Sequence, residues 1–230
     1  MMKDLSMQFE PVCSCPVFRL KEPGSALTHL AGLVWAVAAT PLLLILAAQQ
    51  GRAAPQLMAI SVFSLTLIGL YAASTAYHAL NLPGGKNKLL KKLDHTMIFF
   101  LIAGTYTPLC LITLAGNGGE GLLIKVWAVA LGGTALKQIW VTHPKWLSSV
   151  LYIGMGWLCL TEFPAVLTLM DRRGFWWLLS GGVLYTVGGV IYALKLKRLN
   201  ELHPHFGSHE IFHLFVLAGS FCHYMTMFYL

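Results

Sequence analysis

Seven apolar segments, each of roughly 20 residues, occupy most of this 230-residue chain. They lie at about 25–47, 57–80, 95–115, 122–141, 148–170, 175–194 and 209–229. A segment of this length and hydrophobicity spans the hydrocarbon core of a bilayer as a helix. The alternation of apolar and polar residues that marks a barrel strand is absent. The sequence therefore predicts an all-α membrane protein, a bundle of seven transmembrane helices.

The composition leaves no room for a soluble domain. Hydrophobic residues make up 57% of the chain and charged residues only 11%, which is outside the range of ordinary soluble proteins. The linkers between the apolar segments are short and carry the glycine, proline and charged residues typical of loops. We therefore expect a polar N-terminal segment over 1–24, without a cleavable signal, and one transmembrane domain over 25–230.

The basic residues predict the orientation of the chain. On alternate sides of the spans, twelve of the sixteen lysines and arginines fall on the side of the N-terminus. These are Lys3, Arg19, Lys21, Lys86, Lys88, Lys91, Lys92, Lys137, Lys145, Lys195, Lys197 and Arg198. The positive-inside rule then places the N-terminus in the cytoplasm and the C-terminus outside. Topology and anionic lipids account for the net charge of +7, so nucleic acid binding is not expected.

Polar side chains from three distant segments fall at one depth, near the cytoplasmic ends of their spans. They are Ser74 and His78 in the second span, Asp94 in the third, and His209 and His213 in the seventh. His209 and His213 are spaced i, i+4, so they project from one face of a helix about one turn apart. Three histidines with an open position are a ligand set of catalytic zinc. We therefore predict a zinc site at His78, His209 and His213, with Asp94 and Ser74 as candidate catalytic groups.

Simpler interpretations of the same residues remain open. A His-x-x-x-His pair at a helix start can be an interfacial pair, and a serine in a span can bond back to the carbonyl four residues earlier. His95 points about 100° away from Asp94 on a helix and is interpreted as interfacial. Iron or manganese could replace zinc.

Two further features concern the other half of the bilayer. His223 lies about 21 Å beyond His209 along a helix, so it cannot share an ion with it. Glu162 reaches a similar depth in its own span, and we expect the two side chains to form one buried polar network. Pro108 and Pro164 are expected to break their helices.

Several motifs together resemble the bacterial hemolysin III proteins, which belong to the progestin and adipoQ receptor superfamily and are related to the alkaline ceramidases. The motifs are "STAYHAL" at 74–80, "LDHTMIFFLIAGTYTP" at 93–108, "GMGW" at 154–157 and "HEIFHLFVLAGSFCHY" at 209–224. Thr28-His29, preceded by Glu22, matches the start pattern of the family.

The resemblance implies a seven-helix fold with a cytoplasmic N-terminus and a zinc ion bound by His78, His209 and His213. It also implies that Asp94 hydrogen-bonds the zinc-bound water and that Ser74 is the serine of the motif. For Glu22 and His29 it suggests no more than contacts behind the zinc ligands.

Three functions are compatible with these residues. The first is a zinc-dependent hydrolase that cleaves an amide or ester bond of a membrane lipid, in the manner of a ceramidase. The second is a lipid-binding sensor or receptor with a structural zinc. The third is a pore-forming cytolysin, although a channel should carry polar residues along the full length of several helices. Membrane lipids are the expected partners in the first two cases, and the sequence indicates no protein partner.

Overall fold

A computed structural model describes residues 20–140, 144–194 and 207–230, and these residues form helices and no strands. The helices are α1 (Pro23–Gln49), α2 (Ala54–Ala79), α3 (Lys86–Pro108), η1 (Leu109–Thr113), α4 (Gly119–Ile139), α5 (Lys145–Gly156), η2 (Leu158–Glu162), α6 (Phe163–Leu169), α7 (Arg172–Leu194), α9 (Ser208–Thr226) and η3 (Met227–Tyr229). Seven stretches are long and apolar enough to cross a membrane, which confirms the predicted seven-span helical fold. Residues 1–19, 141–143 and 195–206, with five of the basic residues used for orientation, lie outside the described parts.

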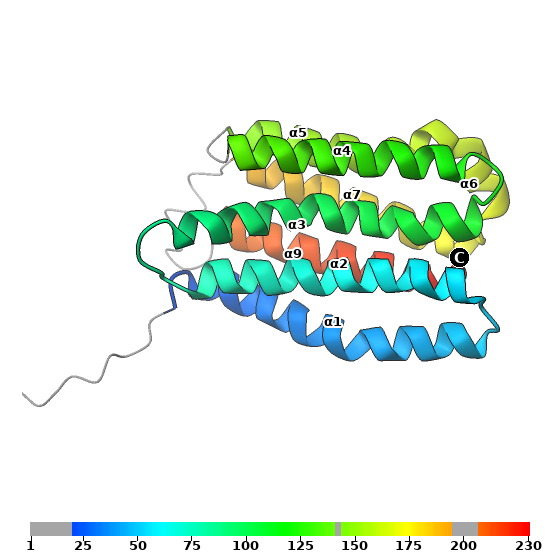
Figure 1. Ribbon diagram of the computed structural model, residues 1–230, viewed down its shortest axis with the longest axis horizontal. Coiled ribbons are helices and arrows are strands. Elements are labelled where there is room, and N and C mark those ends of the chain that lie inside the picture. The colour runs from blue at the N-terminus through cyan, green and yellow to red at the C-terminus, as the bar shows by residue number, and fades with distance from the viewer. Residues whose placement is uncertain (1–19, 141–143, 195–206) are drawn as a thin grey trace, which may run out of the picture.

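The long helices run side by side as one bundle (Figure 1). α1 packs against α2, α2 against α3, and α7 against α9. The start of α1, the end of α2 and the starts of α3 and α9 lie at the same end of the bundle (Figure 1). Segments that are far apart in the sequence therefore meet at this end, which we call the histidine end.

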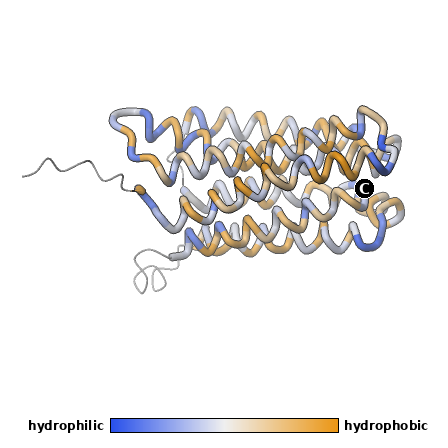
Figure 2. Tube along the Cα trace, turned by 90° about the horizontal axis from the view of Figure 1, so that it is seen from below, coloured by the Kyte–Doolittle hydropathy of each residue, from blue (hydrophilic) through white to orange (hydrophobic). Residues whose placement is uncertain are grey.

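The surface of the bundle suits a hydrocarbon environment. Hydrophilic residues gather at the two ends and hydrophobic residues cover the length between them (Figure 2). Large apolar side chains point outward, for example Leu65 with 67% of its surface exposed and Ile124 with 70%. A soluble protein rarely exposes so much apolar surface, so these side chains indicate contact with lipid. The chain is therefore a multi-pass membrane protein.

Two span boundaries differ from the sequence prediction. α3 begins at Lys86, earlier than the apolar segment at 95–115, because lysines do not interrupt a helix and hydropathy detects only the part within the hydrocarbon. The fifth span is not one helix: α5 ends at Gly156, and η2 and α6 complete the crossing. Pro164 lies in the first turn of α6 and Pro108 directly precedes the π-helical turn η1. Pro164 therefore coincides with a break, as predicted. At Pro108 the helix continues to Thr113 and only its hydrogen-bond pattern changes, so the predicted break is not found there.

Candidate functional site

Three histidines converge at the histidine end of the bundle. His78 is near the end of α2, and His209 and His213 are in the first turns of α9. One ring nitrogen from each lies within 4.8 Å of the others, so the three could hold a metal ion. The Nε2 atoms of His78 and His209 are 3.4 Å apart. The structure thus brings together the three residues predicted as ligands, which we call the histidine cluster.

A carboxylate orients His78. The His78 Nδ1–H group donates a hydrogen bond to Oε2 of Glu22, and the backbone N–H of Glu22 donates to the His78 carbonyl at 2.9 Å. A carboxylate only accepts hydrogen bonds, so the proton resides on Nδ1 and the Nε2 lone pair faces the cluster. The bond from His78 also keeps the pKa of the Glu22 carboxyl below its ordinary value. A carboxylate behind a histidine ligand is a common arrangement in metal sites.

α1 orients His213 in a similar way. The Thr28 hydroxyl donates to the backbone carbonyls of Gly24 and Ser25, at 3.0 and 2.9 Å, so it can only accept from the Nδ1–H of His213, which is 3.2 Å away. The Nε2 lone pair of His213 is left for the cluster. The ring of His29 stacks on that of His213, with centroids 3.6 Å apart. Thr28 and His29 therefore define the plane of the His213 ring.

Glu210 connects the start of α9 to α1 through a hydrogen bond. Its carboxylate accepts hydrogen bonds from the Ser25 hydroxyl, at 2.6 Å, and from the backbone N–H of Gly207, at 2.8 Å. The second bond satisfies a free N–H group at the helix start. Sequence reasoning did not identify Thr28 or Glu210 as part of the site. Both residues lie inside the motifs that resemble the hemolysin III proteins, but their contacts could not be predicted, because these join helices from opposite ends of the chain.

Asp94 and Ser74 lie beside the histidine cluster. Both side chains line the same cavity as His209 and His213, and the Ser74 hydroxyl is next to the Asp94 carboxyl. The side chain of Asp94 is only 14% exposed. Ser74 Oγ is buried and makes no hydrogen bond of normal geometry within the described part of the chain. It does not bond back to the carbonyl four residues earlier, whereas Ser64 does, at 3.1 Å. The interpretation of Ser74 as simple helix support is therefore wrong.

Two expectations for other polar residues are not met. His95 was interpreted as interfacial, but its side chain is 13% exposed, lines the cavity and donates from Nδ1 to the Lys91 carbonyl at 2.7 Å. The predicted network between Glu162 and His223 is absent. Glu162 instead forms an ion pair with Lys125 at 3.7 Å, because η2 turns its side chain toward the start of α4. Similar depth in two spans does not determine which way a side chain points.

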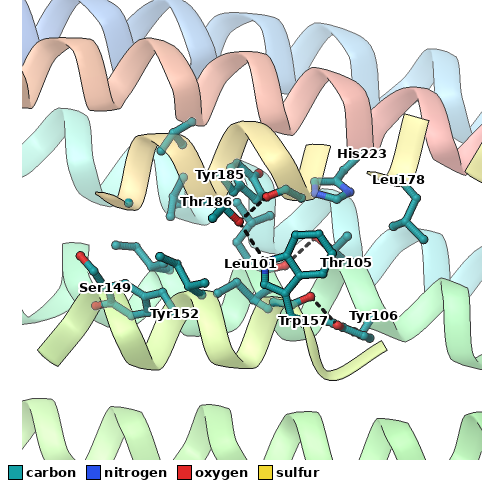
Figure 3. A pocket seen from close by; sticks show the side chains of 18 of the residues that line it. Leu101, Thr105, Tyr106, Ser149, Tyr152, Trp157, Leu178, Tyr185, Thr186 and His223 are labelled. Atoms are coloured by element: carbon teal, nitrogen blue, oxygen red, sulfur yellow. Dashed lines mark hydrogen bonds between the residues drawn. The ribbon is translucent and has the colours of Figure 1, made fainter. Parts of the chain in front are cut away.

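A single cavity of about 170 Å³ connects the histidine cluster to the middle of the bundle. Asp94, Ser74, His209 and His213 line one end of it, and His223 belongs to the wall further along α9. Most of the remaining wall is apolar (Figure 3). The largely apolar wall suits an apolar ligand.

The contact between Glu22 and His78 makes a testable prediction. Glu22→Gln keeps a hydrogen-bond acceptor behind His78 but removes its negative charge, so His78 becomes a weaker metal ligand. We expect metal affinity to fall about 10- to 100-fold, measured by titrating the purified protein with zinc against a chelator of known affinity. Glu162→Gln makes the same chemical change at the opposite end of the bundle and should leave the affinity unchanged. An unaltered affinity in Glu22→Gln would show that the carboxylate does not support the site.

The chain is similar in sequence to known bacterial and animal proteins. The chain is 37% identical to Hemolysin-3 of Bacillus cereus over 203 residues, which cover 88% of each chain. It is 36% identical to the Hemolysin-3 homolog of Bacillus subtilis (strain 168), over 89% of this chain and 92% of the relative. A more distant similarity, 24% over 72% of this chain and 67% of the relative, links it to the human monocyte to macrophage differentiation factor. The sequence profile of the Haemolysin-III related family matches residues 18–224. With this match across nearly its whole length, the chain belongs to the haemolysin-III related family.

Proposed function

We propose that the chain is a zinc-dependent hydrolase that cleaves an amide or ester bond of a membrane lipid. The observation that carries this proposal is the position of the histidine cluster at the end of an apolar cavity, with the carboxyl of Asp94 and the hydroxyl of Ser74 in the same wall.

The donor set fits zinc. Ligand nitrogens about 2.0–2.1 Å from a tetrahedral ion lie about 3.3–3.4 Å from each other, and the Nε2 atoms of His78 and His209 are 3.4 Å apart. Glu22 and Thr28 hold the Nδ1 protons of two of the rings, so neutral imidazole lone pairs face the cluster. Three imidazoles with a fourth position open are typical of catalytic rather than structural zinc.

The residues around the cluster supply what hydrolysis requires. Zinc at His78, His209 and His213 would polarise a substrate carbonyl and lower the pKa of a bound water. Asp94 would accept a proton from the attacking water and return it to the leaving group. The Ser74 hydroxyl, which lacks a partner of normal geometry, can donate to the oxygen on which negative charge develops.

The cavity determines the class of substrate. Its apolar wall would bind a hydrocarbon chain through burial of apolar surface, and the polar group to be cleaved would then lie at the histidine cluster. With the N-terminus in the cytoplasm, as the basic residues predict, the cluster lies in the cytoplasmic leaflet of a bacterial cytoplasmic membrane. Labelling of cysteines introduced next to Lys86 and Arg172 with a membrane-impermeant reagent tests this orientation, because only the second should react in intact cells.

Asp94→Asn tests the catalytic assignment. The amide keeps the size of the side chain but cannot accept a proton from water. We expect release of fatty acid from ceramides and other N-acyl lipids to fall by about 10²- to 10⁴-fold, measured by mass spectrometry on purified protein. Metal content should stay near that of the wild type, because Asp94 is not a ligand. Equal rates in the variant and the wild type would reject Asp94 as the catalytic base.

A lipid sensor with a structural metal is the second candidate. The largely apolar and buried wall of the cavity favours it, since a lipid could occupy such a cavity without being cleaved. In this case lipid binds to wild type and to Asp94→Asn alike, and neither releases fatty acid.

A pore is a third possibility only because two bacterial relatives carry the name Hemolysin-3. In the described part of the chain, the cavity is mainly apolar and its polar groups concentrate at the histidine end. A water-filled pore needs polar residues along its full length. Release of a dye from liposomes that contain the protein would be the evidence for this function.

A further inference from the structure

One buried histidine has no role in the histidine cluster. His223, on α9, has only 6% of its surface exposed and lines the cavity. Its Nδ1 atom is buried and has no hydrogen-bond partner among the described residues. An imidazole without a partner in an apolar surrounding is unfavourable, because its hydrogen bonds to water have been lost and not replaced.

The closest polar neighbours of His223 are already paired. The ring of Tyr185 lies against that of His223, with centroids 5.1 Å apart. Its hydroxyl, however, is 2.8 Å from the Ser220 hydroxyl, which also accepts a hydrogen bond from Tyr71 at 2.9 Å. Two hydrogen bonds link these three hydroxyl groups, and none of the three is hydrogen-bonded to His223.

Several other polar side chains of the wall have hydrogen-bond partners, whereas the buried hydroxyl of Ser149, on α5, has none among the described residues (Figure 3). Trp157 Nε1 donates to the Thr186 hydroxyl at 2.9 Å, and Thr186 donates to a backbone carbonyl at 2.7 Å. Tyr106 and Thr105 likewise donate to backbone carbonyls, at 2.6 and 2.8 Å. In the middle of the cavity, His223 therefore presents a buried ring nitrogen that has no hydrogen-bond partner among the described residues.

His223 stands at a defined distance from the histidine cluster. It follows His213 by ten residues and His209 by fourteen on the same helix, which corresponds to about 15 and 21 Å along the axis. An extended chain advances about 1.2 Å for each bond. A linear hydrocarbon chain that starts at the cluster would therefore reach His223 after about 12 to 17 bonds.

We propose that His223 forms a second polar subsite, which hydrogen-bonds a hydroxyl group in the distal part of a lipid chain whose polar head is held at the histidine cluster. The subsite rests on the proposed function, in that it requires a lipid chain in the cavity. A neutral group is expected here, because a charge would be strongly disfavoured at this depth. His223 thus determines specificity and takes no part in the cleavage.

Gly181 on α7 provides an independent way to disturb the subsite. A methyl group on Gly181 would lie 2.7 Å from Nε2 of His223, so Gly181→Ala must displace the imidazole without changing its chemistry. The next residue is a matched control. A methyl group on Gly182 would meet only the Trp157 ring, at 3.9 Å, which is an ordinary van der Waals contact.

The test is a comparison of fatty acids on the purified full-length protein in lipid nanodiscs. Stearic acid, the hydroxystearic acid with its hydroxyl beside the carboxyl group, and isomers of that acid hydroxylated along the distal third would each compete with a fluorescent fatty acid. We expect a distal isomer to bind the wild type about 3- to 10-fold more tightly than stearic acid. This preference should disappear in His223→Phe and Gly181→Ala and persist in Gly182→Ala.

The outcomes separate the subsite from the hydrolase. Equal binding of all the acids to the wild type would overturn the subsite, and would mean that water or packing satisfies His223. The subsite would also be overturned if His223→Phe still preferred a distal hydroxyl. It would be overturned again if the wild type bound none of the acids. If the preference is found but no N-acyl lipid is cleaved, the hydrolase fails and the subsite stands.

Discussion

Replacing His213 by alanine is expected to remove the bound metal. The wild-type protein, purified in detergent, should contain about one zinc ion per chain, because three imidazoles are the usual protein ligands of such a site. His213→Ala leaves two histidines and a gap beside the ring of His29, which stacks on His213 in the wild type. We therefore expect the zinc content to fall close to zero, as measured by elemental mass spectrometry.

His95→Ala is the matched control for this experiment. His95 also lies at the histidine end and lines the cavity, but its Nδ1 donates to the Lys91 carbonyl and it is not part of the cluster. The zinc content of the His95→Ala variant should equal that of the wild type. If the wild type contained iron or manganese and no zinc, the identity of the metal would be wrong but the metal site itself would be supported. Wild-type protein that is folded and free of metal would contradict the site itself.

The largest expected effect on stability is at Gly119. This glycine begins α4, and a methyl group on it would lie 2.3 Å from the backbone oxygen of Cys110 and 2.6 Å from that of Leu114. Neither carbonyl can move away without shifting η1, the turn that ends the third span. Overpacking of this kind costs about 1–3 kcal/mol. We expect Gly119→Ala to lower the Tm by roughly 2 to 4 °C for each kcal/mol lost.

Gly121→Ala is the control in the same helix. No atom lies within 4 Å of a methyl group at this position. Because alanine favours a helix over glycine by about 1 kcal/mol, this variant should be at least as stable as the wild type. Thermal unfolding in one detergent would compare the two. A Tm for Gly119→Ala equal to that of Gly121→Ala would show that η1 yields easily, and that the close approach is not essential.

Much of the fold could be predicted because the membrane limits the secondary structures that an apolar segment can adopt. A span must satisfy its own backbone hydrogen bonds, so a long apolar segment has little alternative to a helix. The early start of the third span and the end of α5 at Gly156 were not predicted, because hydropathy carries no information on either. Lys86 extends a helix beyond the hydrocarbon, and the breaks between α5, η2 and α6 depend on local backbone geometry.

The candidate site was also predictable in part. His78, Asp94 and His213 could be placed at one depth from the topology alone. In the structure Asp94 and His213 line one cavity, and His78 meets His213 in the histidine cluster. The residues that orient the ligands were harder to find. Thr28 acts on His213 across 185 positions of sequence, a contact that exists only because α1 and α9 pack together. Glu162 shows the converse, since equal depth with His223 did not bring the two into contact.

The sequence by itself determined that the chain crosses the membrane seven times and that three histidines lie near one end of their helices. These properties follow from hydropathy and periodicity, which are local. Only the tertiary structure decided that the ring nitrogens of these histidines converge, that Glu22 and Thr28 hold two of the rings, and that a single cavity runs from them to His223. Which side chains face each other depends on how each helix is rotated about its axis, and the packing of all the helices together determines that rotation.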